Sequence, residues 1–430
     1  MKKQILKKVL PAAIIAASLS TSAQAANWLM LQGTEKANQA PRAKVWGFMQ
    51  LDYQKTDDSR PPSGLKAAFN QMAPNLTTSE GFNVRRARIG VRGNNFPLDS
   101  KVNYFLLSEF GNNGITTGKG ASQGQLTDAS VTLNHIKGAR IRMGLFKTPG
   151  SEEGMQSATV GNYINFSNVT DRISNERFYD EPTNNSGRNG SVSAFRDLGI
   201  QVFDSFDIKG WETSYALMLG NGNGLARTDN NQFLDTYAYL STEKVFGKSE
   251  GGRRHGFKLY AWNHEGKRTF KTTPGEKSLS RSGLGTTYAD GKYRATAEYI
   301  IADGMIYGGS AGAKTPADGA LFSTQTDQKA NGYYVDLGYR VKPNVELNLR
   351  YDRLNSGTEK DANSGKNSDV QREFSTTTLG VQYFFNKKTT LMANYEIRDV
   401  KAPTAPSTAP VHKVLDAVDN RIALQVRVVY

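Results

Sequence analysis

Three arginines, at 86, 88 and 92, fall in the same alternating phase of the segment FNVRRARIGVRG, residues 82–93. Side chains alternate between the two faces of a strand, so Arg86, Arg88 and Arg92 would share one face about 7 Å apart, with Gly90 leaving space. Guanidinium groups stay charged at physiological pH and donate paired hydrogen bonds that match phosphate or carboxylate oxygens. The spacing therefore predicts a ladder of anion-binding groups. The alternative is that these arginines pair with loop carboxylates and only shape the electric field.

Two other segments would add cations to the same ladder. In 139–148 and 419–430, the apolar residues occupy one face of a strand and the arginines occupy the other. An anion would then pass between several weak sites in succession, which allows it both to enter and to leave. The four added residues are Arg140, Arg142, Arg421 and Arg427.

Catalytic patterns are absent from the sequence. The four histidines fall at expected strand ends or in loops, and none belongs to a nucleophilic or metalloprotease motif. The glycine-rich stretch 221–224 lacks the following helix that a phosphate-binding loop needs. We therefore expect no enzyme activity, no cofactor and no metal. The histidines are His135, His255, His264 and His412.

The charged faces require strands that position them. Transmembrane strands are segments of about 10 residues in which apolar and polar residues alternate. Sixteen segments fit this description: 43–55, 82–93, 100–110, 125–136, 139–148, 195–206, 211–220, 234–246, 256–265, 281–289, 292–303, 331–341, 344–355, 373–385, 388–399 and 419–430.

The connections between these segments alternate in length. Seven short joins rich in turn residues separate eight longer stretches rich in Gly, Ser, Asn and Asp. This alternation predicts an even-stranded antiparallel barrel with short periplasmic turns, long external loops and both ends on the short-turn side. The long stretches are 56–81, 111–124, 149–194, 221–233, 266–280, 304–330, 356–372 and 400–418.

Segment 344–355 shows why the charged faces should line water. Leu347 and Leu349 share one face, whereas Glu346 and Arg350 share the other. An Arg or Lys that faces lipid at mid-bilayer costs about 2–4 kcal/mol, so the polar faces must point inward. A soluble β-sandwich would reverse the assignment, but it does not explain unequal loops or aromatics near the ends of the apolar faces. We therefore predict an all-β, 16-stranded transmembrane barrel over residues 43–430.

The N-terminus resembles an export signal. Four lysines precede an apolar run that is too short for a membrane-spanning helix, and Ala23-Gln24-Ala25 fits the signal peptidase pattern. Residues 1–25 are thus expected to be removed, which lowers the net charge from +14 to 14 − 4 = +10. An amphipathic membrane anchor is the alternative. Residues 26–42 are expected to form a periplasmic extension.

The C-terminus indicates assembly into the outer membrane. Residues 420–430 alternate cleanly and stop at the aromatic Tyr430, as in proteins that the barrel-assembly machinery recognises; an ordinary edge strand is the alternative. The chain has no cysteine, and a barrel closed by backbone hydrogen bonds needs no disulfide. Lys and Arg are spread along the chain rather than gathered in runs, which argues against nucleic acid as a partner.

Four motifs resemble the phosphate-selective porins O and P. They occur in the family's order and fall within residues 43–225. The resemblance implies a homotrimeric 16-stranded channel that takes up anions through a basic lumen, and the arginine cluster and Lys147 carry over by motif. The motifs are RRARIGV at 85–91, MGLFKTP at 143–149, RDLGIQ at 196–201 and LGNGNG at 219–224.

The loop 149–194 is the longest, and in 16-stranded porins the loop at this place folds into the barrel and narrows it. Its net charge is 3 − 6 = −3, which would oppose the basic wall and temper anion selectivity. The acidic residues are Glu152, Glu153, Asp171, Glu176, Asp180 and Glu181, and the basic ones are Arg172, Arg177 and Arg188.

These patterns together predict a passive porin in the outer membrane of a Gram-negative bacterium. It would lie among lipid and lipopolysaccharide, form a homotrimer, and pass small hydrophilic solutes with a preference for anions such as phosphate. Two alternatives stay open: a non-conducting barrel that acts as an adhesin or scaffold, and an exported soluble lectin-like β protein.

Overall fold

The structure is a computed structural model of the chain. It describes residues 27–30, 34, 41–57, 80–95, 98–113, 115–116, 124–176, 193–226, 229, 231–246, 254–269, 275–309, 323–359, 371–409, 412, 415 and 419–430. The expected signal peptide, residues 1–25, lies outside the described residues. Among the described residues, no helix is long and apolar enough to cross a membrane.

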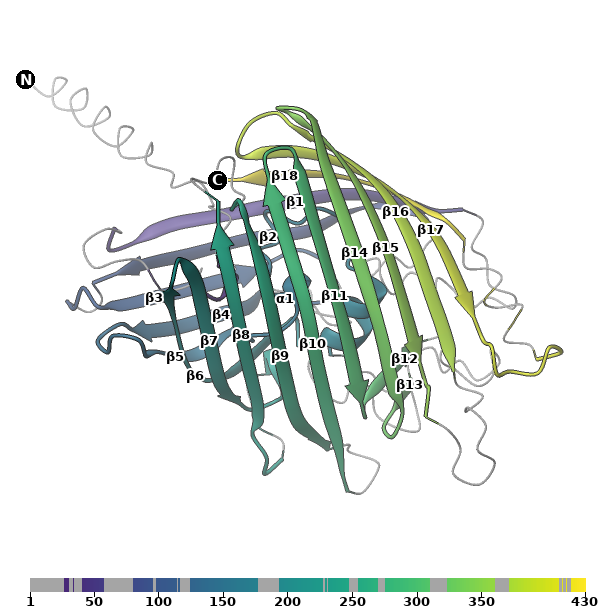
Figure 1. Ribbon diagram of the computed structural model, residues 1–430, viewed down its shortest axis with the longest axis horizontal. Helices are drawn as coiled ribbons and strands as arrows, with labels where there is room; N and C mark the ends of the chain where they lie inside the picture. Colours follow the sequence, from purple (N-terminus) through teal and green to yellow (C-terminus); the bar gives the residue numbers. More distant parts are fainter. Residues whose placement is uncertain are drawn as a thin grey trace, which may run out of the picture.

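Sixteen antiparallel strands close into one barrel, which confirms the predicted fold class (Figure 1). Each expected segment overlaps one strand. The strands are β1 (Lys44–Thr56), β2 (Glu80–Asn94), β3 (Val102–Glu109), β4 (Gln125–Leu133), β5 (Arg140–Lys147), β6 (Arg196–Ile208), β7 (Trp211–Gly220), β8 (Asp235–Val245), β9 (Gly256–Thr269), β10 (Glu276–Asp290), β11 (Tyr293–Asp303), β14 (Lys329–Lys342), β15 (Val345–Ser356), β16 (Arg372–Phe384), β17 (Thr389–Lys401) and β18 (Arg421–Val429).

A small hairpin outside the barrel sheet was not predicted. Strands β12 (Ile306–Gly309) and β13 (Ser323–Gln325) pair with each other in the connection between β11 and β14. Their shortness explains the omission, because a strand of three or four residues is too short to show a period of two.

The seam between β1 and β18 closes the barrel. Beyond the ladder that joins the two strands, Gly47 and Tyr430 exchange backbone hydrogen bonds of 3.1 and 3.0 Å. The Tyr430 hydroxyl also donates to the backbone carbonyl of Arg88 at 3.0 Å. A side chain at Gly47 would meet the Tyr430 ring, since a Cβ there would lie only 2.7 Å from it. The terminal aromatic residue is therefore part of the closure.

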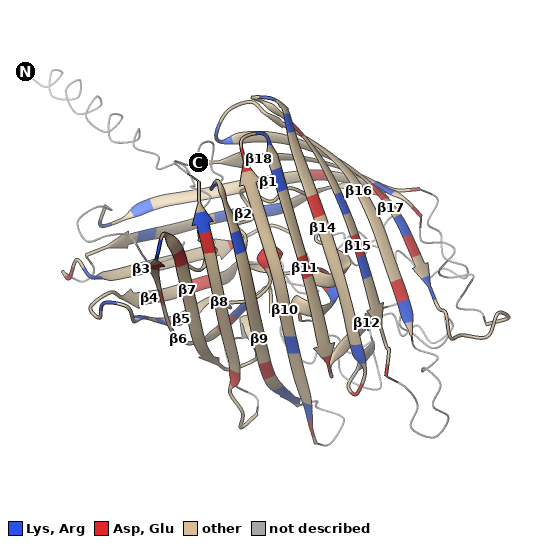
Figure 2. Cartoon of the chain, viewed as in Figure 1, with Lys and Arg blue, Asp and Glu red and all other residues tan. Residues whose placement is uncertain are grey.

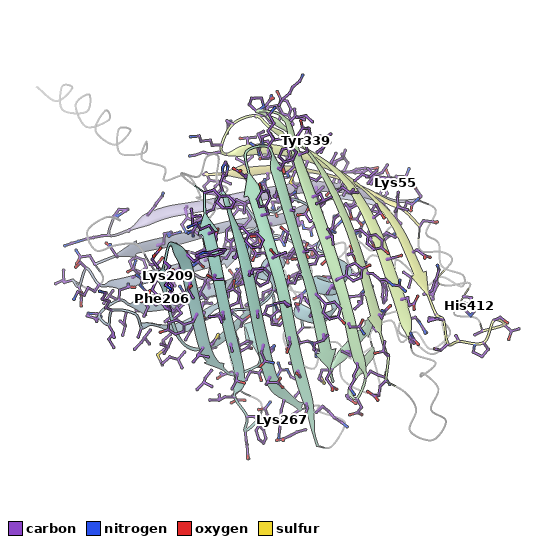
Figure 3. All side chains as sticks on the ribbon, in the orientation of Figure 1. Lys55, Phe206, Lys209, Lys267, Tyr339 and His412 are labelled. Atoms are coloured by element: carbon purple, nitrogen blue, oxygen red, sulfur yellow. The ribbon has the colours of Figure 1, made fainter. Side chains whose placement is uncertain are left out.

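The two faces of the strands separate as the alternation predicts. In β15, Leu347, Leu349 and Tyr351 are exposed on the outer face, whereas Asn348 and Arg350 are buried on the inner one. Basic and acidic residues follow one another along several strands (Figure 2). Aromatic side chains such as those of Phe206 and Tyr339 project from the outer surface toward the short-turn end (Figure 3).

Residues 27–30 of the N-terminal segment lie inside the barrel. The short 3-10 helix η2 (Trp28–Met30) contains Leu29, which packs into the largest interior apolar cluster. Asn27 donates to Glu212 on the inner wall at 2.9 Å. These residues were expected to belong to a periplasmic extension, 26–42. They lie inside instead because inward-facing side chains of the barrel wall bind Asn27 and pack on Leu29, and a local sequence pattern cannot reveal such distant partners.

A charge on the lipid-facing side of β15 should destabilise the barrel. Leu349→Arg is expected to lower the free energy of unfolding by about 2–4 kcal/mol, since the guanidinium would face hydrocarbon. Urea unfolding in lipid vesicles measures this loss. Leu349→Ala is the control, because it removes the same side-chain contacts without adding a charge. Equal stability of the Arg and Ala variants would contradict the assignment of this face to lipid.

Candidate functional site

The loop between β5 and β6 crosses the interior of the barrel. Its described part contains the short helix α1 (Glu152–Met155), capped by Ser151, and the single π turn η5 (Thr170–Ser174). It contacts inward-facing side chains of β1, β11, β14, β15 and β17. The loop therefore occupies part of the cross-section of the lumen.

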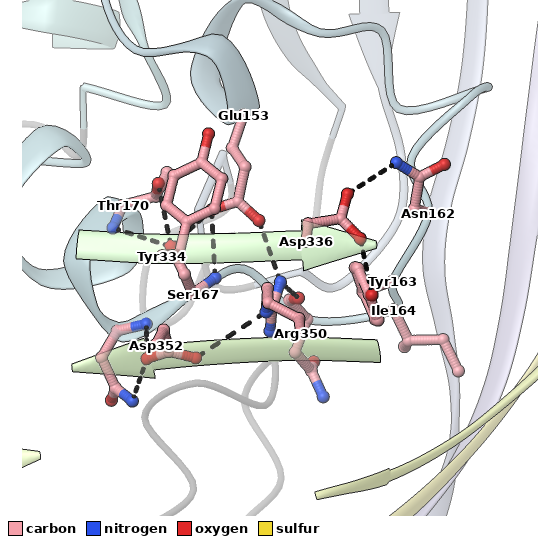
Figure 4. Close-up of polar contacts among 12 residues, drawn as sticks. Glu153, Asn162, Tyr163, Ile164, Ser167, Thr170, Tyr334, Asp336, Arg350 and Asp352 are labelled. Atoms are coloured by element: carbon pink, nitrogen blue, oxygen red, sulfur yellow. Dashed lines mark hydrogen bonds and ion pairs between the residues drawn. The ribbon is translucent and has the colours of Figure 1, made fainter. Parts of the chain in front are cut away.

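An ion pair between Glu153 and Arg350 anchors the loop to β15 (Figure 4). The two groups are 2.9 Å apart, and Arg350 also donates to the Asn165 carbonyl at 3.0 Å. On the loop side, the Ser167 backbone amide donates to Glu153 at 3.1 Å. Removing one member of such a buried pair typically costs about 3–5 kcal/mol, because the other is left as an uncompensated charge.

Further hydrogen bonds hold the same loop along the wall (Figure 4). Asn168 donates to Asp352 at 2.7 Å from its side chain and at 2.9 Å from its backbone. The Tyr163 hydroxyl donates to Asp336 at 2.7 Å. Burial and the charge of Asp336 raise the pKa of Tyr163, so its hydroxyl stays a neutral donor. The loop is thus fixed by polar contacts with strands far along the chain.

Most described acidic residues of the loop bind cations of the wall. Glu152 pairs with Lys258 at 2.6 Å, and Glu176 pairs with Arg268. Together with Glu153, these carboxylates hold the loop in place, and each of them is paired with a cation of the wall. Four other charged residues counted in the expected net charge of −3 lie outside the described residues: Arg177, Asp180, Glu181 and Arg188.

A cavity beside the loop contains the cationic part of the candidate site. It encloses about 1410 Å³, part of which is open to solvent, and its lining includes Arg86, Arg88, Lys147 and Arg196. Arg88 pairs with Glu109 at 2.6 Å, and Arg196 pairs with Asp128 at 3.0 Å. Two of these four cations are thus matched by carboxylates of the wall.

Arg86 is held differently from its neighbours. It donates to the side-chain oxygen of Gln50 at 2.7 Å, and its Nε is buried without a hydrogen-bond partner. Among the residues that the structure describes, no carboxylate forms an ion pair with it. Lys147 likewise donates to backbone carbonyls of α1 and the residue after it, at 2.8 to 3.2 Å. The cavity therefore carries positive charge that neutral groups hold in place.

The structure brings only part of the predicted ladder to this cavity. Arg86, Arg88 and Lys147 line it, whereas the other predicted residues lie elsewhere. Arg140 pairs with Asp204, Arg421 pairs with Glu396, Arg142 stacks on Phe203, Arg92 lies over Phe105, and Arg427 donates to the Gly161 carbonyl.

Arg85 is an inward-facing residue that the sequence reading missed. Strict alternation would turn it away from the face of Arg86. The pairing of β1 with β2 shifts register between Gln50 and Leu51, and the resulting bulge lets Arg85 pair with Asp52 at 3.3 Å. The sequence did contain a sign of this bulge. Arg85 and Arg86 are adjacent in a membrane-spanning strand, and neither guanidinium group could face lipid. Arg196 and Lys258 also line the cavity and were not predicted, although Arg196 begins the motif RDLGIQ.

Comparison with solved structures supports the porin architecture. Three solved structures of outer-membrane proteins each match 90% of this chain. An anion-selective porin from Comamonas acidovorans is 14% identical, with a TM-score of 0.54 over 99% of its chain. Salmonella typhi OmpF in complex with daunomycin is 12% identical, with a TM-score of 0.55 over 97%. The trimer form of OmpT, an outer membrane protein of Vibrio cholerae, is 12% identical, with a TM-score of 0.51 over 99%.

Sequence comparison identifies the family. No curated protein gives a significant match. The model of the family named phosphate-selective porin O and P matches residues 65–242 and 273–424, which is most of the chain. The closed barrel and its inward-facing charges agree with this match. The chain therefore belongs to the phosphate-selective porin O and P family and is a porin of the Gram-negative outer membrane.

Proposed function

We propose that this porin passes small hydrophilic solutes by diffusion and prefers anions. The observation that carries the proposal is Arg86, a buried cation in the cavity wall whose partner is the neutral Gln50. A charge removed from water is costly unless an opposite charge approaches it. A passing anion can supply that charge and leave again, because Gln50 holds the guanidinium in place when no anion is bound.

The pairing of the loop carboxylates strengthens this proposal. Glu152, Glu153 and Glu176 each bind a cation of β9 or β15. They are therefore less available to repel an anion near Arg86 than a free acidic loop would be. The relative from Comamonas acidovorans that is described as an anion-selective porin is consistent with this preference.

Phosphate is one anion that the proposal includes. Two forked guanidinium groups, of Arg86 and Arg88, line the cavity together with the Lys147 ammonium, and such donors match phosphate oxygens. Since Arg88 is already bound to Glu109, we propose a general anion preference in which phosphate competes with chloride.

Replacing Arg86 by glutamine should reduce anion selectivity. Loss of one unit charge about 8 Å from the permeating ion changes its energy by about 0.5 kcal/mol in a water-like medium, or about twofold in permeability ratio. The reversal potential of the purified protein in planar bilayers under a KCl gradient measures this ratio. Arg353→Gln is the control, because Arg353 lies on the outer face of β15 and is exposed.

Three other results would count against the proposal. A cation-selective wild-type channel would remove the anion preference but leave the porin. An unchanged ratio in Arg86→Gln would make Arg86 a structural residue. No current from folded protein would favour the alternative of a non-conducting adhesin or scaffold.

We also propose that the loop is the constriction of the channel. Arg350→Met removes the cation that holds Glu153, so the loop should move more and the open-channel current should become noisier and larger. Arg353→Met is the matched control on the same strand, because its side chain points outward. Identical current noise in both variants would show that the Glu153–Arg350 pair does not steady the conducting path.

A homotrimer is the assembly we propose. Strands β3, β4 and β5 have only 8, 9 and 8 residues, close to or below the length of about 9–11 that spans a bilayer. Contact with another protomer would shield these short strands from lipid. The similar OmpT structure is described as a trimer form. We expect the mass of the detergent-purified complex, measured by light scattering, to be three times that of one chain; a monomeric mass would contradict this assembly.

A further inference from the structure

The N-terminal segment Asn27–Met30 occupies the lumen beside the candidate site. Asn27 donates to Glu212 at 2.9 Å and to Ser214, both on the inner face of β7. The indole Nε1 of Trp28 donates to the Glu152 carboxylate of α1 at 2.9 Å. The segment thus bridges the barrel wall and the loop that crosses the lumen.

Residues 41 and 42, which precede β1, lie at the short-turn rim. The carbonyl of Pro41 accepts a hydrogen bond from the Asn94 backbone amide, and that of Arg42 accepts one from the Tyr104 hydroxyl. These contacts lie beside the start of β1 at Lys44. Residues 41 and 42 therefore lie at the rim, whereas residues 27–30 lie in the lumen.

Apolar packing holds the segment in the interior. Leu29 is only 5% exposed and belongs to a cluster with Met155 of α1 and with Tyr239, Tyr260 and Trp262 of β8 and β9. A side chain that is buried between wall and loop excludes water from both. The helix α1 therefore contacts part of the wall through residues of the N-terminal segment.

Trp28 shares the cavity with the cations of the candidate site. Its side chain lines the same cavity as Arg86 and Lys147. The carboxylate that it binds, Glu152, also pairs with Lys258 at 2.6 Å. Without the indole, the cavity would be wider and one oxygen of Glu152 would lose its donor.

We infer that Trp28 is a specificity-determining residue of the channel, because the N-terminal segment builds the constriction jointly with the loop. The indole narrows the passage, and its N–H occupies an oxygen of Glu152 that would otherwise repel anions. This inference rests on the proposed channel function. It assigns to residues 27–30 a role inside the conducting path.

Single-channel recording separates the two contributions of Trp28. Trp28→Phe keeps a large ring but loses the N–H, so conductance should stay near wild type while anion preference falls. Trp28→Ala should lower the preference and also raise conductance by about twofold, since the narrowest section limits current. Deleting residues 27–34 should raise conductance at least as much. Phe385→Ala is the control, because this exposed aromatic lies in a short turn outside the lumen.

A disulfide tests the position of the segment independently of current. The chain has no cysteine, so Asn27→Cys combined with Ser214→Cys creates the only possible pair. The hydrogen bond between these two side chains makes the two positions neighbours, which a disulfide requires. We expect the cross-link to form in membrane-embedded protein and to be seen by mass spectrometry after proteolysis.

The outcomes distinguish the inference from the proposed function. Wild-type conductance and selectivity in Trp28→Ala and in the deletion variant, both of which must first be shown to be folded by heat-dependent gel mobility, would overturn the inference and leave the channel. Failure of the cross-link in folded protein would also overturn it. Absence of current from the wild type, with the cross-link formed, would overturn the channel function instead.

Discussion

The absence of hydrogen-bonding partners in lipid is the constraint on which this structure depends. Every backbone amide and carbonyl within the bilayer must pair with another strand, so the sheet has to close on itself. The ladder between β1 and β18 achieves this closure, and the bonds between Gly47 and Tyr430 extend it to the end of the chain. Because the pleat alternates, closure also decides which side chains are inside.

Closure creates an interior that is crowded with charge. Charges withdrawn from water are stable only when partners compensate them, and the wall and the loop supply those partners to one another. Glu152, Glu153 and Glu176 meet cations of distant strands, so the path of the loop follows the positions of the wall cations. Arg86 departs from this rule, since its partner is an amide.

The strands could be predicted because their physical signal is local. Alternating residues such as those of 344–355, with turn residues between segments, place all sixteen strands of the barrel. The bulge at Arg85 could not be placed, because a register shift depends on the neighbouring strand. The position of Trp28 and Leu29 inside the lumen was missed for a similar reason: their partners on α1, β8 and β9 are more than a hundred residues away.

The candidate site was only partly predictable. Alternation assigned Arg86 and Arg88 to the inner face. It could not show that Arg88 forms an ion pair with Glu109, whereas Arg86 donates to the neutral Gln50. Nor could it show that Arg140 and Arg421 are bound to carboxylates of adjacent strands. A strand pattern gives the direction of a side chain, whereas its availability to a solute depends on the three-dimensional neighbours.

The seam also imposes an order on folding. Its two strands come from opposite ends of the chain, so their pairing has the longest loop to close and is expected to be slow. Until Val429 reaches Phe48, both strands have open edges that can pair with other chains. A chain that lacks its final strand would therefore keep an exposed edge prone to aggregation.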